Sequence, residues 1–318
     1  MEEVPSVTAT SETGFPRPLK RGGAVDLSST LLWASVMSAS SGCLTEGRNK
    51  SLRKTITLIA IVVAALFLVP ASQAITDGEL DGNGHPAVVL VLMEVNGAPA
   101  FRCSGTLLSA TIVLTAGHCA GEPGEFSGIR IFAEANVQTD PTYPFAGGPN
   151  TYEATAWASH PQFTESAFFL HDVGIIKLAN PVPGVSQYGT LPGVNSLDVL
   201  KTRRGQQDVT FTAVGYGVQR INPVFVVAQK VRMVAHPKLN QINGGIVGDY
   251  SLLLSNNAST GGTCFGDSGG PNFVGTSMVV GGVTSFGLNG TCGGTGGVFR
   301  MDRANVQNFI NSFIAAHP

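Results

Sequence analysis

Charged residues are scarce in this 318-residue chain: only 13% are Asp, Glu, Lys or Arg, and the formal net charge is −2. A basic excess is missing, which argues against a dedicated nucleic-acid-binding protein. Bulk disorder is also excluded, because 43% of the residues are hydrophobic and can build one large or two ordinary cores. The 40 glycines lack a Gly-X-Y period, so they indicate tight turns in an all-β chain rather than collagen.

No apolar run reaches the about 20 residues that a transmembrane helix needs. The run from Ile56 to Val69 is shorter; it follows a basic cluster and precedes small residues around Ala74. Short apolar runs in this setting are typical of secretory signals. We therefore expect a signal peptide over residues 51–74, cleavage after Ala74 and an extracellular product. An uncleaved membrane anchor is the alternative reading of the same run.

Residues 1–50 are rich in Ser, Thr, Gly and Pro and show no sustained apolar periodicity. We expect them to be a disordered leader extension, or to lie upstream of the true start of the protein. The folded domain is then expected to cover residues 75–318, without stable membrane association after cleavage.

Cysteine is rare, and none of the five cysteines forms a CxxC motif, so a zinc site is not indicated. Four cysteines follow the expected cleavage site, and in an oxidising compartment they indicate disulfides with three possible pairings. Pairing of sequence neighbours, Cys103–Cys119 and Cys264–Cys292, is one hypothesis, and each bridge would contribute about 3 kcal/mol. We find no metal-ligand cluster or phosphate-binding loop in the sequence, so no metal or cofactor is expected.

Short β-branched or apolar runs bounded by Gly, Pro, Asn and Asp follow residue 75 and predict strands. The predicted strands cover residues 86–95, 105–116, 172–179, 208–218, 224–234 and 278–286. After Asp302, the expected N-cap, apolar side chains recur at helical spacing from Val306 to Ile314. The pattern predicts an all-β domain closed by one C-terminal helix, with barrels as a way to bury the sheet edges.

Three motifs contain the groups that nucleophilic acyl transfer requires: a hydroxyl, a base and a carboxylate that orients the base. His118 lies in LTAGHC, Asp172 in HDVGIIKL and Ser268 in GDSGGP. Taken singly, each has an ordinary structural explanation, as a packed core histidine, a turn aspartate or a loop serine. Their combination in this order, with these flanking residues, indicates a catalytic triad.

With these motifs the chain resembles the chymotrypsin/trypsin-like serine proteases over residues 75–318. SGTLLS (104–109), SHPQF (159–163), VGYG (214–217), TSFG (284–287) and GGVF (296–299) extend the resemblance. It implies an all-β fold of two six-stranded antiparallel β-barrels, with a boundary near residues 190–205, the active site between them and a C-terminal α-helix. The interval from His118 to Asp172 is longer than usual for the family, and we expect an extended surface loop within residues 143–160.

The resemblance also implies a role for each matching residue. Ser268 attacks the scissile carbonyl, His118 takes and later returns the proton, and Asp172 orients the imidazole. The backbone N–H groups of Gly266 and Ser268 form the oxyanion hole, where each donor stabilises the transition state by about 3 kcal/mol. Cys103–Cys119 and Cys264–Cys292 match two disulfides of the family.

Substrate recognition is implied by the same resemblance. Ser285, Phe286 and Gly287 match the segment that pairs with the substrate backbone. Gly262, Thr263, Gly287 and Gly297 match positions around the specificity pocket, and Gly262 stands where trypsin-like members carry an aspartate. A substrate Lys or Arg would be buried there unpaired, at a cost of several kcal/mol. We therefore predict an apolar or aromatic residue before the scissile bond (P1).

Activation in the family uses a new N-terminal amine that pairs with the aspartate before the catalytic serine, here Asp267. In the family the new N-terminus is Ile-Val-Gly-Gly or a variant of it. Ile75-Thr-Asp-Gly, directly after the predicted cleavage site, fits this pattern. No Lys or Arg precedes Ile75, so we expect signal peptidase itself to create the active N-terminus.

Three other functions are compatible with parts of the sequence. GDSGG also fits the nucleophile elbow of α/β-hydrolases, but that elbow needs a following helix and the order Ser, Asp, His, whereas Pro271 and β-branched residues follow Ser268. A catalytically inactive binding module and a secreted esterase-type acyl hydrolase on the same fold stay as alternatives. The favoured reading is a secreted, monomeric serine endopeptidase whose partners are protein or peptide substrates and not nucleic acid.

Overall fold

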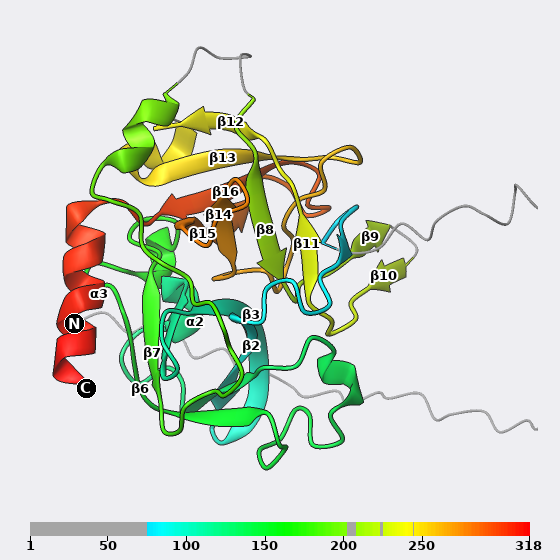
Figure 1. Ribbon diagram of the computed structural model, residues 1–318, viewed down its shortest axis with the longest axis vertical. Coiled ribbons are helices and arrows are strands. Elements are labelled where there is room, and N and C mark those ends of the chain that lie inside the picture. The colour runs from blue at the N-terminus through cyan, green and yellow to red at the C-terminus, as the bar shows by residue number, and fades with distance from the viewer. Residues whose placement is uncertain (1–74, 202–207, 223–224, 244) are drawn as a thin grey trace, which may run out of the picture. The chain divides into compact units, whose positions relative to one another are not determined.

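The computed structural model describes residues 75–201, 208–222, 225–243 and 245–318 (Figure 1). The predicted leader extension (1–50), signal peptide (51–74) and cleavage site lie outside the described residues, apart from Ile75 after the cut. Strands dominate, as the sequence predicted. None of the described helices is long and apolar enough to cross a membrane.

Six antiparallel strands form a closed barrel in the order β2-β3-β4-β7-β6-β5. These strands are β2 (Val88–Val95), β3 (Ala98–Leu107), β4 (Ile112–Thr115), β5 (Gly128–Phe132), β6 (Thr151–Ser159) and β7 (Gly174–Leu178). In β2 the first six residues, VVLVLM, are all buried, because one face fills the barrel and the other packs against the rest of the domain. Burying each such side chain contributes about 1.5–3 kcal/mol.

The second half of the domain is an eight-stranded sheet in the order β1-β11-β8-β14-β15-β16-β13-β12. Its strands are β1 (Glu79–Leu80), β8 (Phe211–Gly215), β11 (Met233–Ala235), β12 (Leu239–Ile242), β13 (Ser251–Asn256), β14 (Pro271–Val274), β15 (Val280–Gly287) and β16 (Gly294–Arg300). A separate hairpin contains β9 (Arg220–Asn222) and β10 (Phe225–Val227).

This second sheet differs from the closed six-stranded barrel that the resemblance implied. Its strand ladder is open, and β12 returns to the start of β8 only through an isolated bridge between Thr210 and Lys238. Two backbone hydrogen bonds flank the bridge, from Phe211 to Pro237 at 2.8 Å and from Leu239 to Val209 at 2.9 Å. These contacts bring β12, at one end of the curved sheet, close to β8 near its other end, around Pro237, which lies between β11 and β12.

Helical segments are short apart from the last one. They are α2 (Gly117–Ala120), η2 (Val137–Thr139), η3 (Glu165–Ala167), η4 (Ser196–Leu200), η5 (Gly245–Tyr250) and α3 (Ala304–Ala316). The predicted C-terminal helix is confirmed as α3, but Asp302 is not its N-cap; that position belongs to Arg303. Asp302 is fully buried instead and accepts two hydrogen bonds from the guanidinium of Arg300.

Some predicted elements had the wrong extent. The predicted strand 105–116 covers the end of β3 and all of β4, and the predicted strand 224–234 contains all of β10 and the start of β11. The expected surface loop within 143–160 is wrong in its second half, because residues 151–159 form β6 and pair with β5 and β7.

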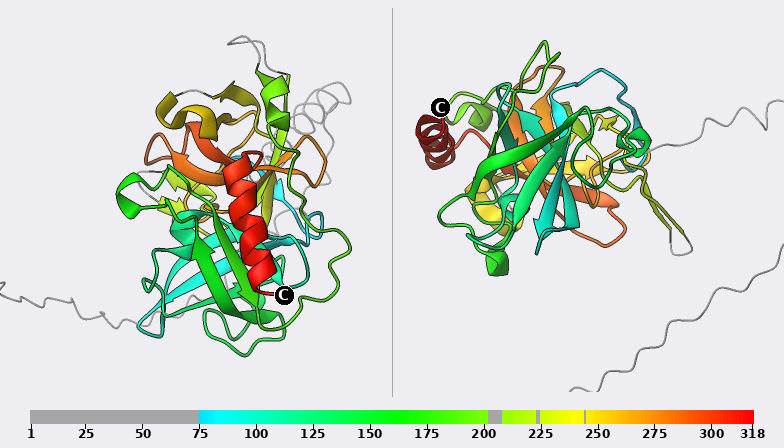
Figure 2. Two further views of the ribbon diagram at one scale, coloured as in Figure 1. Left: turned by 90° about the vertical axis from the view of Figure 1, so that its left-hand side faces the viewer. Right: turned by 90° about the horizontal axis from the view of Figure 1, so that it is seen from below.

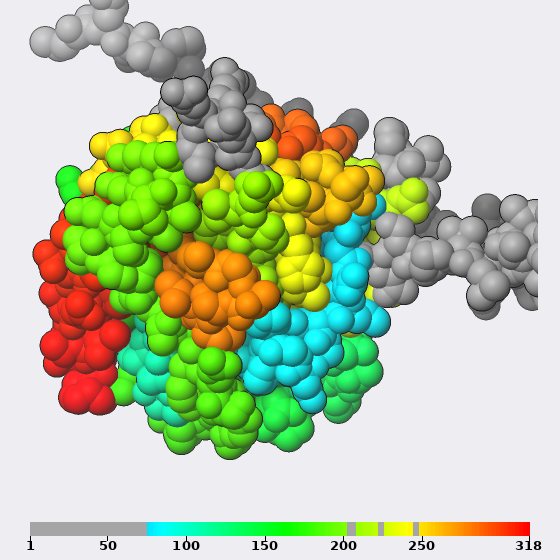
Figure 3. All heavy atoms as spheres, turned by 45° about the horizontal axis from the view of Figure 1, so that its top comes forward, coloured from blue at the N-terminus to red at the C-terminus, as the bar shows by residue number. Residues whose placement is uncertain are grey.

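The two ends of the domain cross over to opposite halves. Near its start, β1 pairs with β11 of the second sheet, and the space-filling view shows this cyan segment beside yellow residues of that sheet (Figure 3). At its end, α3 lies along the first barrel (Figure 2). The ring of Phe309 contacts that of His160, and Lys177 donates a hydrogen bond to the Pro318 carbonyl at 2.7 Å.

Candidate active site

The segment after β4 positions His118. The short helix α2 follows Thr115 and carries His118 next to Cys119, whose disulfide to Cys103 ties this turn to β3. Gly117 precedes the histidine, and a Cβ at this position would lie 2.7 Å from the ring of Phe163. The close packing of this turn therefore fixes where the imidazole emerges.

Asp172 meets His118 through three contacts. The backbone N–H of His118 donates to Oδ1 at 3.0 Å, and Nδ1 of its ring lies 3.0 Å from both carboxylate oxygens. Because an ionised carboxylate only accepts hydrogen bonds, Nδ1 carries the hydrogen and Nε2 is left as the acceptor. The hydroxyl of Ser285 donates to Oδ2 at 2.5 Å, so a fully buried carboxylate holds the ring in one tautomer.

The pKa of His118 is raised above its usual 6.5. Burial of the ring acts in the opposite direction, but the negative charge of Asp172 and its hydrogen bond to the ring outweigh it, with help from Glu165 and Glu125. The site therefore stabilises the imidazolium more than water does, as a base that must hold a proton during a reaction requires.

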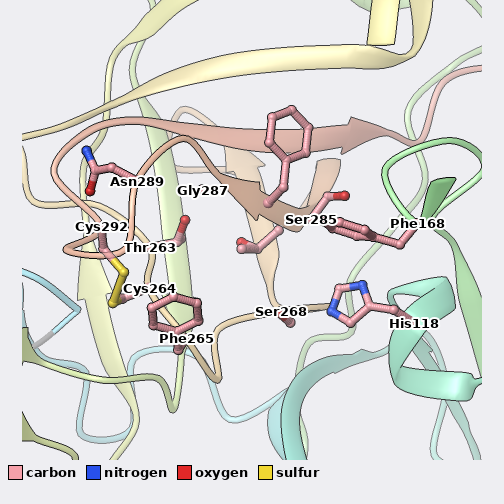
Figure 4. A pocket seen from close by; sticks show the side chains of 12 residues that line it. His118, Phe168, Thr263, Cys264, Phe265, Ser268, Ser285, Gly287, Asn289 and Cys292 are labelled. Atoms are coloured by element: carbon pink, nitrogen blue, oxygen red, sulfur yellow. A yellow bond between two sulfur atoms is a disulfide. The ribbon is translucent and has the colours of Figure 1, made fainter. Parts of the chain in front are cut away.

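Ser268 lies in the turn between β13 and β14, beside the ring of His118 (Figure 4). Within the described residues, the N–H groups of Gly266 and Ser268 donate to no protein acceptor. The carbonyl of each of these two peptide groups is occupied: Val218 N–H donates to Phe265 O at 2.7 Å, and Gly270 N–H donates to Asp267 O at 2.8 Å. Since N–H and C=O of a trans peptide point in opposite directions, both open donors face away from the occupied carbonyls.

Two glycines allow this turn to form. Gly266 and Gly269 have φ of +96° and +76°, a region that glycine adopts readily and other residues rarely. A Cβ on Gly269 would also lie 2.1 Å from Oγ1 of Thr115. Backbone conformation therefore requires Gly266 and Gly269, and close approach to β4 also requires Gly269.

Asp267 is fully buried under the turn. Its carboxylate accepts hydrogen bonds from Gly217 N–H at 2.8 Å and from Cys264 N–H at 2.9 Å. Burial raises the pKa of Asp267 to about 7, while these two bonds and the charge of Arg102 oppose the rise. Within the described residues, no cationic side chain forms an ion pair with this carboxylate.

A cavity of about 280 Å³ opens beside His118 and Ser268. Twelve residues line it: His118, Phe168, Thr263, Cys264, Phe265, Ser268, Thr284, Ser285, Phe286, Gly287, Asn289 and Cys292. Phe265 and the Cys264–Cys292 disulfide lie on the side away from His118 (Figure 4). None of the twelve carries a carboxylate. Three phenylalanine rings and the disulfide form the apolar part of the wall, beside hydroxyl, amide and imidazole groups.

Two residues expected at the pocket, Gly262 and Gly297, do not line this cavity. The side chain of Asn256 packs against Gly262, where a Cβ would lie 2.3 Å from its Cγ, and the ring of Phe286 lies 2.3 Å from a Cβ built on Gly297. Thr263 and Gly287, the other two expected residues, are in the wall. Asn256 is itself held by bonds to Thr76 at 2.6 Å and to Thr263 at 2.8 Å.

Both disulfides of the neighbour pairing are present, Cys103–Cys119 and Cys264–Cys292. Cys103, Cys119 and His118 also place possible ligand atoms within 4.8 Å of one another. Metal binding by cysteine requires a thiolate, and both sulfurs here are consumed by the disulfide. This cluster is therefore no metal centre.

Sequence reasoning missed several residues that shape the site. Phe168 and Phe265 flank the cavity, and Ser104 and Asn256 hold the segments behind it. Phe265 directly precedes the GDSGG motif, and this position could have identified it as a residue of the site. Asn256 and Ser104 are separated in sequence from the residues they support; Ser104 begins the SGTLLS motif, but that motif does not indicate a contact with the turn around Ser268, and no local pattern marks Asn256.

Comparison with known proteins agrees with this geometry. The family model described as Trypsin matches residues 79–310. The chain is 29% identical over 197 residues to brachyurin of Leptuca pugilator, covering 60% of this chain and 78% of brachyurin. It is 28% identical over 251 residues to alkaline trypsin C of Manduca sexta, covering 74% and 90%, and 27% identical over 222 residues to chymase of Mus musculus, covering 67% and 83%.

Solved structures show the same fold. The HL collagenase structure superposes with a TM-score of 0.59 at 18% identity, covering 76% of this chain and 98% of that one. The structure of HBP gives a TM-score of 0.56 at 17% identity, with 76% and 97% coverage.

Proposed function

The chain belongs to the trypsin family, and on that premise we propose that it is a serine endopeptidase that cleaves peptide bonds through a His118–Asp172–Ser268 triad. Ser268 attacks the carbonyl carbon of the substrate while Nε2 of His118 takes the hydroxyl proton. The acyl-enzyme forms when His118 passes that proton to the leaving amine, and water then repeats the sequence to release the acid.

One observation carries this proposal. The ring of His118 is held at Nδ1 by a buried carboxylate, beside a serine in a turn that leaves two N–H donors open. Such donors stabilise a developing oxyanion by about 3 kcal/mol each. A binding module would gain nothing from two unpaired donors next to a tautomer-locked base.

A serine-directed fluorophosphonate probe tests the proposal. We expect it to label the wild-type protein and not Ser268→Ala, and we expect cleavage of a peptide library by the wild type only. An unlabelled, inactive but folded wild type would identify an inactive module. Hydrolysis of esters with no cleavage of any peptide would identify an esterase.

We further infer a preference for an apolar or aromatic P1 residue. The cavity is lined by Phe265, Phe286 and a disulfide, and Asn256 fills the space beside Gly262 where a carboxylate would be needed for Lys or Arg. Peptides that differ only at P1 test this inference. We expect Phe or Leu to be cleaved at least 10-fold faster than Arg, and a preference for Arg would contradict it.

Secretion and activation by one cleavage after Ala74 form the last part of the proposal. Two features support it. Ile75 is fully buried against Val231, Met233 and Ala235, and Asp267 is a buried carboxylate without an ion-pair partner among the described residues. A free amine at Ile75 would supply the missing charge. N-terminal sequencing of active enzyme from the culture medium is expected to begin at Ile75; any other start contradicts this route.

A further inference from the structure

Ser104 is a fully buried serine in β3, directly after Cys103. It is not a member of the triad, and its side chain does not line the cavity. Its hydroxyl nevertheless forms two hydrogen bonds, one to the turn that contains the open N–H donors and one to the residue that follows β8. It donates to the carbonyl of Gly266 at 2.9 Å and accepts from the N–H of Tyr216 at 3.0 Å.

The backbone of Ser104 adds two more links. Its N–H donates to the carbonyl of Ser268 at 2.8 Å, and its own carbonyl accepts from Oγ1 of Thr115 at 2.8 Å. Thr115 is the last residue of β4, three positions before His118. Ser104 therefore connects the strand that leads to the histidine with the turn that presents Ser268.

These contacts join the two halves of the domain. β3 belongs to the closed barrel, whereas Tyr216 follows β8 and Gly266 precedes β14, both in the second sheet (Figure 1). The Gly266 carbonyl lies 162 positions from Ser104 in the sequence. Among the described residues, the Ser104 hydroxyl is the only side-chain donor to the backbone of the turn from Phe265 to Ser268.

Gly266 needs such a contact because glycine has little conformational preference of its own. Its N–H belongs to a peptide whose carbonyl is fixed by Val218, and its carbonyl belongs to the next peptide, fixed by Ser104. With both flanking peptides held, φ and ψ of Gly266 are set. The N–H of this second peptide also donates to the Cys264 carbonyl at 3.0 Å, so the Ser104 bond holds the carbonyl end of the peptide. Without the Ser104 bond the peptide would be held at its N–H end alone, and the spacing of the Gly266 and Ser268 donors would vary more.

We propose that Ser104 is a positioning residue of the oxyanion hole, whose hydroxyl fixes the Gly266–Asp267 peptide so that both N–H donors point at the reacting carbonyl. The inference rests on the proposed protease function. The donors matter most when negative charge develops on the substrate oxygen, so loss of the hydroxyl should affect the transition state more than substrate binding.

The test is Ser104→Ala, measured with a fluorogenic peptide and with a peptide boronate that mimics the tetrahedral intermediate. Loss of one hydrogen bond of this kind is worth about 1.4 kcal/mol, or about 10-fold in rate. We expect kcat to fall about 10-fold with KM nearly unchanged. Boronate affinity should fall by the same factor, while binding of the cleaved peptide product should not.

Thr106→Val is a matched control. Thr106 is a fully buried hydroxyl residue in the same strand, and its Oγ1 has no hydrogen-bond partner in the described structure. Valine preserves its shape, so we expect wild-type kcat and boronate affinity. A loss equal to that of Ser104→Ala would overturn the proposal, because any change in β3 would then have the same effect.

Wild-type kcat and boronate affinity in Ser104→Ala would also overturn it, even if the melting temperature fell. Ser104→Cys serves if the alanine variant does not fold: the thiol is a weaker donor, so kcat should lie below that of the wild type, and an unchanged kcat again overturns the inference. A wild type that neither cleaves peptide nor reacts with the probe contradicts the proposed function instead, so the two failures are distinguishable.

Discussion

Ser285 donates its hydroxyl hydrogen to Oδ2 of Asp172 at 2.5 Å, on the carboxylate that also holds the ring of His118. A segment expected to pair with the substrate backbone is thereby bonded to the carboxylate that orients the base. If substrate pairs with this segment as proposed, its binding and the orientation of His118 depend on the same buried hydrogen bond.

The first prediction concerns this bond. In Ser285→Ala the carboxylate of Asp172 loses a donor, and a hydrogen bond to a charged group is worth about 1.5–3 kcal/mol, so kcat should fall at least about 10-fold. Asp172→Asn should lower kcat by about 10⁴, as this replacement does in the serine protease template, because the amide favours the wrong tautomer. Steady-state kinetics on a fluorogenic peptide measure both. Ser277→Ala, at an exposed turn, is the control and should be unaffected.

The second prediction is a pH dependence. Catalysis needs neutral His118, and the pKa of His118 is raised, so kcat/KM should fall as the pH drops through a value above 6.5. Glu165 contributes to the rise, and Glu165→Gln should shift the acidic limb of the pH profile to lower pH. Glu79→Gln, in exposed β1, should leave the profile in place. A profile of Glu165→Gln identical to that of the wild type would contradict the assigned electrostatic coupling.

The third prediction concerns stability in acid. The rings of His160 and His171 stack at 4.9 Å next to Asp172, and burial together with the nearby His171 lowers the pKa of His160 to about 4. Burial lowers the pKa of His171 as well. A base whose pKa is depressed by folding stays neutral in the native state and gains its proton on unfolding. Stability should therefore fall as the pH drops from about 6.5 toward about 4.

His171→Asn tests this stack. His171 has φ of +56°, and asparagine tolerates this region well, so the variant should fold. Urea unfolding midpoints are measured for Ser268→Ala, the inactive parent, and for Ser268→Ala with His171→Asn added. Between pH 7 and 4.5, the midpoint of the double variant should depend less on pH than that of the parent. His236→Asn, at an exposed position, should keep the parent's dependence. An equal dependence in all three proteins would show that the stack is not the cause.

The fourth prediction concerns the pocket base. Gly262→Asp should not create a preference for Arg, because its Cβ would lie 2.3 Å from Cγ of the buried Asn256. Overpacking of this kind costs about 1–3 kcal/mol, so the variant should be less stable. Adding Asn256→Gly should restore stability and allow cleavage after Arg. Thermal melts and the Arg-to-Phe cleavage ratio give the result, with Gly290→Asp, which has open space, as the control. A stable, Arg-specific single variant would contradict the packing argument.

The sequence was most informative where function and backbone conformation impose local patterns. GDSGGP predicted a glycine-rich turn, and the structure shows positive φ at Gly266 and Gly269. The helical stripe from Val306 to Ile314 predicted α3, since its apolar face packs on the core. Each of these features is determined by residues within one turn or one helix.

Sequence reasoning failed where distant residues compete for the same group. Asp302 looks like an N-cap locally, but Arg300 and the N–H of Leu197 take its carboxylate. Strand β6 was missed although polar and apolar residues alternate along TYEATA, because its inward-facing residues are mainly alanines, which are only partly buried and have low strand propensity. The pocket base is a similar case. A glycine at position 262 predicts open space, but the side chain of Asn256 packs against it.

The crossing of the two chain ends has a consequence for how this protein unfolds. Because β1 completes the second sheet and α3 packs on the first barrel, each half carries a segment that the other half needs. Unfolding of one half would remove a segment that the other half needs. We therefore expect both halves to unfold together, in a single cooperative denaturation transition. If the chain has the proposed protease activity, such interlocking keeps the population of partly unfolded molecules low and so limits self-digestion.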